Sequence, residues 1–338
     1  MINLISDTVT RPSAEMLQVM LRAKVGDDVF GEDPGVNQLE AYAANLLGKE
    51  SALFCPSGTM CNQIAIRTHT RPMDEMICES SSHVYKFENG GYAFHSGIAI
   101  DMIEGQYGKI TADQITAKIK PKADWLPNSR LVVIENTTNM GGGNYYTLDE
   151  IMAIKKVCKK RGLVLHMDGA RFFNAIVETG DKPNRIARHL DSISICLSKG
   201  LGAPVGSLLI GDNDYIAQAR KWRKAMGGGM RQAGYLAAAG IYALENNVKR
   251  LKEDHLKAQM LAQTLSTLPY IGDIRPVKTN ILIFDVLPPL TANNFLEKLA
   301  KKGIKAVPFG PQTVRFVTHL DFTEEMLKET MNVLLELV

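Results

Sequence analysis

The sequence lacks any strong excess of one charge. Its 39 basic and 36 acidic residues leave a formal net charge of +3 over 338 residues, and so small a net charge does not favour binding to nucleic acid. The densest basic run, residues 155–161, lies in a segment whose apolar positions (Leu148, Ile151 and Ile154) recur at helical spacing. We therefore expect these basic residues to form the exposed face of a helix and predict no nucleic-acid partner.

Long apolar runs and cysteine motifs are also missing. No stretch approaches the roughly 20 apolar residues of a membrane span, and the first residues lack the basic and apolar regions of a signal peptide. The five cysteines form no CxxC pair and show no metal-ligand spacing, which predicts reduced thiols and no metal site. We therefore predict a soluble, cytoplasmic protein with no membrane partner.

Short apolar runs alternate with amphipathic helical segments over most of the chain. This alternation is typical of an α/β fold with a mainly parallel central sheet. Capping boxes mark the start of two helices, at Thr111 with Gln114 and at Thr147 with Glu150. Strands are predicted at residues 52–55, 75–78, 98–103, 131–135, 163–168, 192–197 and 207–210.

The pattern changes after residue 231. An alanine-rich segment over residues 232–247 predicts a long helix that continues through residue 252. The compact set of elements beyond it predicts a small α+β domain. We expect a large domain over 1–245, which includes the N-terminal segment, and a small domain over 246–338. The small domain is predicted to contain strands at 280–286, 304–307 and 314–318 and helices at 292–302 and 324–337.

Lys199 follows the apolar run 192–197, and nothing in the folding of that segment requires a lysine there. Asp168 ends another apolar run farther upstream. An amine at the mouth of a buried strand tends to lose its charge, and a neutral amine is a nucleophile. A lysine and an aspartate in these positions suit a pyridoxal-phosphate enzyme. The lysine would hold the cofactor aldehyde as a Schiff base, and the aspartate would keep the pyridine nitrogen protonated.

Two further motifs are compatible with this cofactor. Ser57, Gly58 and Thr59 follow a predicted strand and open a helix, where backbone amides, hydroxyls and the helix dipole form a phosphate cup. The same residues also occur as a plain helix cap. His83 lies in a polar loop after the strand predicted at 75–78. It is either an ordinary surface or core histidine or an imidazole that stacks on the cofactor ring and relays a proton.

Two arginines are candidate anion ligands. Arg231 follows three consecutive glycines, so it either lies in a flexible solvated loop or is positioned for a phosphate or carboxylate. Arg315 is the one charge in an apolar strand. It either faces solvent from an edge strand or binds a carboxylate of a neighbour or a substrate.

Taken together, these segments closely resemble the low-specificity L-threonine aldolases, which are fold-type I pyridoxal-phosphate enzymes. The resemblance extends from the first residues to about residue 320, and an ordered set of this length is highly specific. The matching residues are 6–12, 25–31, 57–59, 83, 87–91, 135–137, 166–171, 196–207, 222–224, 227–232 and 314–319.

The resemblance implies a role for each matching residue. Lys199 is implied as the Schiff-base lysine, Asp168 as the partner of the pyridine nitrogen, and His83 as the residue stacked on the ring. The phosphate would bind to Ser57, Gly58 and Thr59, and also to Arg231 and, less certainly, Lys224 of a neighbouring subunit. This implies a homo-oligomer, commonly a tetramer, with shared active sites. The substrate carboxylate would bind to Ser6, Arg171 and Arg315. Arg171 is also expected to contact the cofactor, and Phe30 and Thr138 are expected to lie at the substrate.

The implied activity is the retro-aldol cleavage of L-threonine, L-allo-threonine and related β-hydroxy-α-amino acids to glycine and an aldehyde. Many relatives have tyrosine where this chain has Phe30, and histidine where it has Thr138. Both positions lie near the substrate hydroxyl in the family. Because two hydrogen-bonding side chains are replaced here, His83 or a water that it holds is our preferred base, and phenylserine is a plausible substrate.

Two other interpretations stay open from the sequence. The same scaffold could carry β-elimination, transamination or racemisation, which need the same cofactor residues but break a different bond. A binding protein that has kept the fold without catalysis is the second alternative, and the presence of both Lys199 and Asp168 disfavours it.

Overall fold

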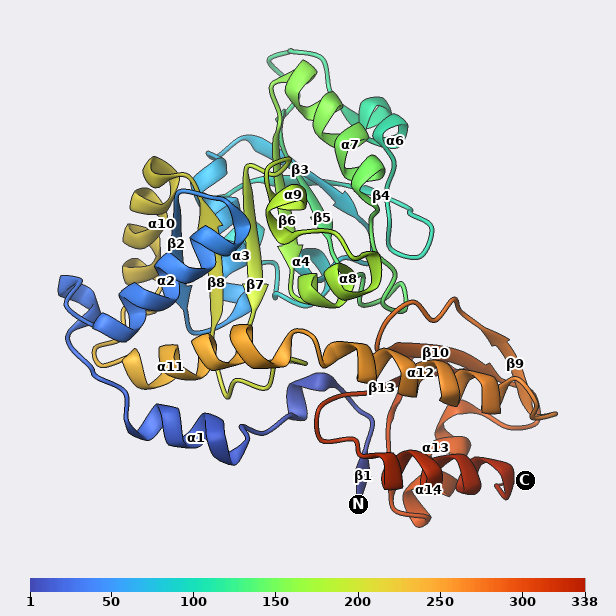
Figure 1. Ribbon diagram of the computed structural model, residues 1–338. Coiled ribbons are helices and arrows are strands. Elements are labelled where there is room, and N and C mark those ends of the chain that lie inside the picture. Colours follow the sequence, from blue (N-terminus) through green and yellow to red (C-terminus); the bar gives the residue numbers. More distant parts are fainter. Residues whose placement is uncertain (338) are drawn as a thin grey trace.

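The computed structural model describes residues 1–337 and consists of a large α/β unit and a smaller α+β unit (Figure 1). The last residue of the predicted small domain, 338, lies outside the described residues. The predicted α/β class with a mainly parallel sheet is confirmed. The large sheet has seven strands in the order β2-β8-β7-β6-β5-β3-β4. Their bounds are β2 Ser51–Cys55, β3 Asp74–Glu79, β4 Ala99–Ile103, β5 Asn128–Glu135, β6 Val164–Gly169, β7 Ser192–Cys196 and β8 Ser207–Gly211.

Strands β4, β3, β5, β6 and β7 are parallel, and β8 is antiparallel to both of its neighbours, β7 and β2. Because two antiparallel steps restore the direction, β2 points the same way as β7. The carboxyl ends of six strands therefore meet at one edge of the sheet, where α/β proteins bind their ligands. This places the segments that follow β2, β3, β5, β6 and β7 side by side.

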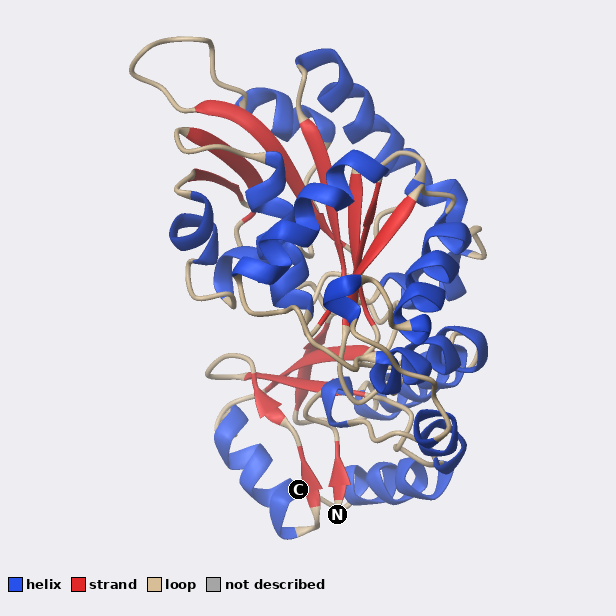
Figure 2. Cartoon of the chain, turned by 90° about the vertical axis from the view of Figure 1, so that its left-hand side faces the viewer, coloured by secondary structure: helices blue, strands red, loops and turns tan. Residues whose placement is uncertain are grey.

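Helices cover both faces of the large sheet, as Figure 2 shows when the sheet is viewed near its edge. The predicted capping boxes at Thr111 and Thr147 are both present. The helices of the large unit are α1 Ala14–Leu21, α2 Pro34–Leu47, α3 Gly58–His69, α4 His83–Lys86, α5 Gly91–Ser96, α6 Ala112–Lys118, α7 Leu148–Arg161, α8 Phe172–Thr179, α9 Pro183–Ala187, α10 Asn213–Ala225 and α11 Gly234–Tyr242.

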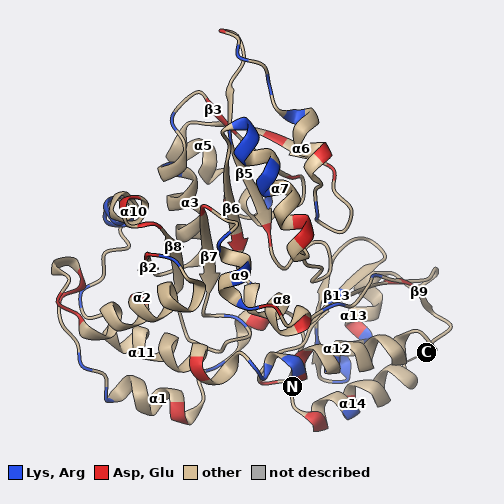
Figure 3. Cartoon of the chain, turned by 45° about the horizontal axis from the view of Figure 1, so that its top comes forward, with Lys and Arg blue, Asp and Glu red and all other residues tan. Residues whose placement is uncertain are grey.

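The basic run on α7 lies where the sequence predicts it. Ile151, Ile154 and Cys158 are buried in the large core, whereas Lys156 and Lys159 are exposed. Figure 3 shows the Lys and Arg positions along α7 in blue. No helix among residues 1–337 is both long enough and apolar enough to cross a bilayer.

The long helix predicted over 232–252 is interrupted. Helix α11 is followed by a π-helical turn over Ala243–Asn247, and α12 (Leu251–Leu265) begins after a short turn. At the interruption Asn247 Nδ2 donates to the carbonyl of Leu201 at 2.7 Å, and Arg250 approaches the carbonyl of Gly200. The break therefore coincides with the place where the helix binds the loop that follows Lys199, as is common for π-bulges at functional sites.

The small unit contains a four-stranded antiparallel sheet in the order β12-β13-β10-β9 and a two-stranded sheet that pairs β1 with β11. The strands predicted at 280–286 and 314–318 and both predicted helices are present. The strand predicted at 304–307 is divided into β11 and β12, which belong to different sheets. β9 is an additional strand that the sequence does not predict. The bounds are β1 Ile2–Asn3, β9 Ile271–Ile274, β10 Ile281–Val286, β11 Ile304–Lys305, β12 Val307–Pro308, β13 Thr313–Val317, α13 Ala292–Lys301 and α14 Glu324–Leu335.

The N-terminal segment contributes to both units, because its first residues pack in the small unit and Met16 of α1 packs in the large core. Strand β1 pairs in parallel with β11, and Ile2 and Leu4 are buried in the core of the small unit. A two-residue strand carries too little periodicity to reveal its partner in the sequence. Along α12, Leu251 packs in the large core and Leu261 in the small core. The boundary at residue 245 stays a prediction.

Candidate active site

Asp168 lies at the carboxyl end of β6 and is 3% exposed. Its Oδ2 accepts a hydrogen bond from Asn62 Nδ2 at 2.8 Å, and its Oδ1 accepts one from the amide of Ala170 at 3.1 Å. Asn62 lies on α3, and its Oδ1 accepts from Ser194 Oγ at 2.8 Å on β7. Two strands and a helix therefore hold this buried carboxylate in one orientation.

His83, the first residue of α4, is joined to the same group of side chains. Its Nδ1 lies 2.9 Å from Glu88 Oε1, and Glu88 also accepts from Asn62 Nδ2 at 2.9 Å. Burial alone would lower the pKa of His83, but the hydrogen bond to Glu88 and the charge of Asp168 outweigh it and raise that pKa. A ring nitrogen of His83 and one carboxylate oxygen each of Glu88 and Asp168 all lie within 4.8 Å of one another.

Glu135 ends β5 directly beside Asp168 on β6. Burial, followed by the repulsion of Asp168, raises the pKa of Glu135 to about 7. Its Oε2 accepts from the amide of His83 at 3.0 Å and its Oε1 from the amide of Asn139 at 2.8 Å. Two titratable carboxyls and an imidazole thus share one edge of the sheet.

Lys199 lies in the loop after β7 and is half-buried. Its carbonyl accepts from Thr10 Oγ1 at 2.9 Å and from the amide of Gly202 at 2.8 Å, which fixes the backbone of the loop. The positive charge of Lys199 lowers the pKa of Asp7 and opposes the upward shift at His83. The lysine is therefore close enough to act electrostatically on residues of two other segments.

The expected phosphate cup has the predicted local structure. Ser57 is the N-cap of α3, and its Oγ accepts from the amide of Met60 at 3.1 Å. Ser57 and Thr59 are exposed at the start of this twelve-residue helix. A Cβ on Gly58 would lie only 2.5 Å from Cys196 Sγ, so the helix start lies directly against the end of β7. The hydroxyls and amides needed for an anion are present, and phosphate binding stays a prediction.

The two arginines expected at the substrate carboxylate differ in what they bind. Arg171 donates from Nε and Nη2 to the two oxygens of Asp7, at 2.8 and 2.7 Å. Arg315 donates from Nη1 to Asn139 Oδ1 and from Nη2 to the carbonyl of Ile5, both at 3.0 Å. Its Nε is buried and has no partner among the described residues. Burial, with the nearby Arg171 charge, lowers the pKa of Arg315 to about 10.

Arg315 does not lie on an edge strand, because β13 runs between β12 and β10. That alternative interpretation of Arg315 is therefore wrong. Ser6 is the N-cap of a short 3₁₀ turn, where its Oγ accepts from the amide and the hydroxyl of Thr8. Both arginines and Ser6 thus bind groups of the protein, and Nε of Arg315 is a buried donor without a partner among the described residues.

The hydroxyl of Thr138 forms a hydrogen bond within the protein. The residue is 1% exposed, and its Oγ1 donates to the carbonyl of Tyr107 at 2.9 Å. A Cβ on Gly108 would lie 2.8 Å from the Thr138 side chain, so a neighbouring loop packs closely against it. A contact of Thr138 with the substrate stays a prediction.

Phe30, Lys224 and Arg231 lie on the surface of the chain. Arg231 is 60% exposed at its side chain and forms an ion pair with Asp27 at 2.8 Å. Its guanidinium lies 5.9 Å from the ring centre of Phe30, which is 73% exposed. A Cβ on Gly229 would lie 3.0 Å from Lys224 Cδ, so the lysine is close to the same loop. Within residues 1–337, these side chains have no hydrogen bond or ion pair with Lys199, Asp168 or His83.

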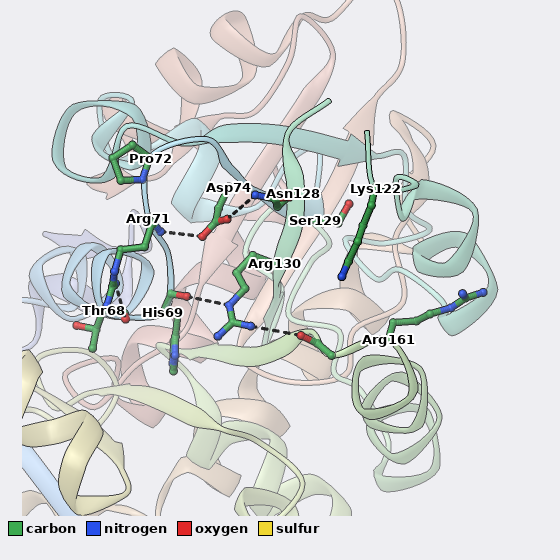
Figure 4. A pocket seen from close by; sticks show the side chains of 11 residues that line it. Thr68, His69, Arg71, Pro72, Asp74, Lys122, Asn128, Ser129, Arg130 and Arg161 are labelled. Carbon is green, nitrogen blue, oxygen red and sulfur yellow. Dashed lines mark hydrogen bonds between the residues drawn. The ribbon is translucent and has the colours of Figure 1, made fainter. Parts of the chain in front are cut away.

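A hollow of about 720 Å³ opens at the opposite edge of the large sheet (Figure 4). Arg130 reaches from β5 toward the carbonyls of His69 and Gly162, at 3.4 and 3.5 Å, and Arg71 donates to the carbonyl of Thr70 at 2.8 Å. These carbonyls lie at the C-terminal ends of α3 and α7, where helices carry partial negative charge. We interpret the arginines as charges that stabilise helix ends and do not assign the active site to this hollow.

Sequence reasoning did not identify four of the residues that organise the site, namely Asp7, Asn62, Glu88 and Glu135. Asp7, Glu88 and Glu135 lie inside segments that carry the family resemblance. The partners of Asp7 and Glu135 are far away in the sequence, and Glu88 binds Asn62 as well as the nearby His83. Asn62 lies one turn into α3 and looks like an ordinary helical polar residue. A signal for it is its position four residues after Gly58, on the helix that begins at the expected phosphate cup.

Comparison with known proteins gives a matching family model and related sequences of nearly equal length. The family model described as "Beta-eliminating lyase" matches residues 3–287. The low specificity L-threonine aldolase of Escherichia coli (strain K12) is 45% identical over 331 residues, which are 97% of each chain. The low-specificity L-threonine aldolase 1 of Arabidopsis thaliana is 37% identical over 338 residues, 98% of this chain and 94% of the relative.

Solved structures show the same fold at lower sequence identity. The threonine aldolase of Leishmania major superposes with a TM-score of 0.87 at 24% identity, over 100% of this chain and 99% of that one. A serine palmitoyltransferase of Sphingomonas wittichii gives a TM-score of 0.78 at 16% identity, over 99% of this chain and 86% of that one. With this fold, this edge of the sheet and relatives of nearly equal length, the chain belongs to the beta-eliminating lyase family and, within it, to the low-specificity L-threonine aldolases.

Proposed function

We propose that this protein is a pyridoxal-phosphate-dependent carbon–carbon lyase. It cleaves L-threonine, L-allo-threonine and related β-hydroxy-α-amino acids to glycine and an aldehyde. The observation that carries the proposal is the convergence of Lys199, Asp168 and His83 at one edge of the sheet, in a chain of this family. β-Elimination, transamination and racemisation are not favoured, because relatives at 45% and 37% identity are named as aldolases.

The residues present fit this cofactor. An aldehyde needs an amine, which Lys199 supplies, and a pyridine nitrogen needs a carboxylate, which Asp168 supplies from a buried position. A phosphate needs hydrogen-bond donors and a positive potential, and the exposed start of α3 offers both through Ser57 and Thr59. When bound, pyridoxal phosphate supplies an electron-accepting ring that allows a bond at the α-carbon of an amino acid to break.

The side chains of the protein then have separate tasks. Asn62 keeps the Asp168 carboxylate in one orientation, so that this charge is already in place when the cofactor binds. Arg315 provides the guanidinium for the substrate carboxylate, and a guanidinium suits that ion because it can donate two parallel hydrogen bonds. Fixing the carboxylate orients the rest of the amino acid, including the bond that is to break.

His83 is the group that we assign to move the proton of the β-hydroxyl, directly or through a water. Its Nδ1 is bound to Glu88, so Nε2 is the atom left to accept a proton. The raised pKa of His83 makes the neutral imidazole available only toward the alkaline side of its ordinary range. Glu88 stabilises the protonated imidazole after the transfer, as a carboxylate does for a catalytic histidine.

We infer further that Arg231, together with Lys224, completes the phosphate site of a neighbouring subunit in a homotetramer. Their exposed position beside Phe30 supports a role between subunits. Light scattering of the purified protein tests the subunit number. Mixing Lys199→Ala subunits with Arg231→Ala subunits tests the sharing of sites. In a hybrid oligomer, a site that takes Lys199 from the Arg231→Ala subunit and Arg231 from the Lys199→Ala subunit would be intact. A mixture no more active than its parents would contradict the sharing.

The activity is tested by incubating the protein with L-threonine, L-allo-threonine and phenylserine separately. We expect glycine and the matching aldehyde in equal amounts, together with a visible absorbance band of bound cofactor that is lost in Lys199→Ala. Pyruvate with ammonia would instead indicate β-elimination. Absence of glycine from all three amino acids would refute the aldolase proposal.

A cytoplasmic location is also proposed. It rests on the five cysteines, all of which are buried free thiols, as is usual in a reducing compartment. Cell fractionation with antibodies to the protein checks this, and recovery of the protein outside the cytoplasm would contradict it.

A further inference from the structure

Glu135 holds together two segments that carry different parts of the candidate site. It is 6% exposed and lies at the end of β5. Its Oε2 accepts from the amide of His83, the first residue of α4, at 3.0 Å. Its Oε1 accepts from the amide of Asn139, in the loop after β5, at 2.8 Å. One buried carboxylate therefore joins the backbones of two segments that are 56 residues apart (139 − 83).

Each joined segment leads to a residue that acts on the substrate in the proposed function. On one side, the backbone of His83 is fixed beside Glu135 while the ring is held by Glu88 at 2.9 Å. On the other side, Asn139 Oδ1 accepts from Arg315 Nη1 at 3.0 Å. Glu135 thus fixes the backbone position of the imidazole and, through Asn139, the direction of the guanidinium.

We propose that Glu135 is a positioning residue that sets the distance between His83 and Arg315. The inference rests on the proposed function, in which the imidazole moves the hydroxyl proton and the guanidinium binds the carboxylate of the same substrate. Because both groups must reach one small molecule, a shift of either segment by about an ångström would lower the rate strongly.

A carboxylate is the side chain that suits this task. Each of its oxygens accepts one amide N–H, whereas glutamine has a single acceptor oxygen and would present its NH₂ group to the other amide. Aspartate keeps both oxygens but is one methylene shorter. Glu135→Gln should therefore break one of the two hydrogen bonds, and Glu135→Asp should weaken the hydrogen bonds to both segments.

The chain offers a matched control in Glu79. This residue ends the adjacent strand β3, is 5% exposed, and its Oε2 accepts from the amide of Ser81 at 2.7 Å. Its other oxygen lies 3.4 Å from the amide of Gly105. Glu79 therefore has the same chemistry, depth and strand-end position, but it holds neither the His83 amide nor the Asn139 amide.

The first measurement is amide hydrogen exchange of the full-length protein, with and without pyridoxal phosphate. We expect Glu135→Gln to speed exchange at the His83 or the Asn139 amide roughly tenfold or more, because a charge-assisted hydrogen bond is lost. Glu79→Gln should speed exchange at Ser81 or Gly105 instead. This result does not depend on catalysis, so it tests the two hydrogen bonds even if the proposed activity fails.

The second measurement separates KM from kcat for the cleavage of L-threonine. Glu135→Gln should raise KM and lower kcat, with kcat/KM reduced roughly tenfold to a hundredfold. Asn139→Ala should raise mainly KM, and its effect should be smaller in the Glu135→Gln background than in the wild type, because both substitutions loosen Arg315. Glu79→Gln should leave kcat/KM within about twofold of the wild type.

Three outcomes would overturn the proposal. One is an equal kinetic loss in Glu135→Gln and Glu79→Gln, which would indicate a general strand-end role. Another is unchanged kinetics in Glu135→Gln despite faster exchange. The third applies if Glu135→Gln does not fold. Asn139→Ala is then the test variant, and an unchanged KM in that variant would contradict the proposal. Absence of glycine from the wild type would instead refute the proposed function and leave the exchange result standing.

Discussion

Asp7 and Arg171 form a bidentate ion pair that is buried on both sides. Arg171 Nε and Nη2 lie 2.8 and 2.7 Å from the two Asp7 oxygens, and the side chains are 6% and 0% exposed. Asp7 also accepts from Asn280 Nδ2 at 3.1 Å, so the pair connects the N-terminal segment, the large unit and the small unit. With Nε and Nη2 of Arg171 engaged in this way, we expect Arg315 to provide the main donor to the substrate carboxylate.

The first prediction separates the two arginines. Arg315→Ala should raise KM for L-threonine roughly tenfold to a hundredfold, because the carboxylate loses a charged donor. Arg171→Ala should mainly lower the free energy of unfolding, by about 3–5 kcal/mol, because it leaves Asp7 buried and unpaired. Steady-state kinetics and urea unfolding measure the two effects. As a control, Arg275→Ala removes another half-buried arginine, which binds the Met140 carbonyl, and should change KM little.

The second prediction concerns stability at low pH. Burial would raise the pKa of Asp7, but the charge and hydrogen bonds of Arg171 outweigh it and lower the pKa from 3.8 to about 2. Because the folded pKa lies below the unfolded one, this group stabilises the fold above about pH 4 and loses that contribution as the pH falls toward about 2. The contribution is about 2 kcal/mol.

Urea unfolding of the wild type and Asp7→Asn over this pH range checks the sign. The difference in unfolding free energy between the two proteins should shrink by about 2 kcal/mol as the pH falls from about 5 to about 2. A difference that stays constant with pH would show that Asp7 does not titrate in this way.

The third prediction concerns the pH dependence of cleavage. The Glu88 carboxylate raises the pKa of His83 against the effect of burial, so the acidic limb of kcat/KM should lie above the ordinary histidine range if His83 is the base. Glu88→Gln removes the charge and should move that limb to lower pH by about one unit. A pH profile of kcat/KM for both proteins measures the shift, and a shift to higher pH would contradict the assignment.

The fourth prediction concerns Thr138. Because its hydroxyl donates to the Tyr107 carbonyl, Thr138→Val should lower the free energy of unfolding by about 1 kcal/mol. The ratio of kcat/KM for L-threonine to that for L-allo-threonine should stay within about twofold of the wild-type ratio. A change in this preference without a loss of stability would place the hydroxyl near the substrate after all.

The elements at the site follow from local sequence. Apolar runs that end in Asp168 and near Lys199, and a serine cap before α3, predict where strands stop and helices begin, and the structure has them there. These signals lie within a few residues of one another, so no knowledge of the tertiary fold is needed. The parallel arrangement then brings the strand ends together.

The contacts that orient the side chains do not follow in this way. The Arg171–Asp7 pair joins residues 164 positions apart, and the bond from Asn62 to Asp168 spans 106. The sequence does not indicate which donor binds to either aspartate. The π-helical turn beside Asn247 has the same origin, because its partner is the Leu201 carbonyl in a distant loop.

The pairing of β1 with β11 has a consequence for the order in which the protein can assemble. Residues 2 and 3 leave the ribosome long before their partners, residues 304 and 305. The small unit therefore cannot close until residue 305 has been synthesised, by which time the large unit can already have formed its own core. During that interval Ile2 and Leu4 remain exposed apolar residues, and a chaperone that binds such residues would meet this protein at its first strand.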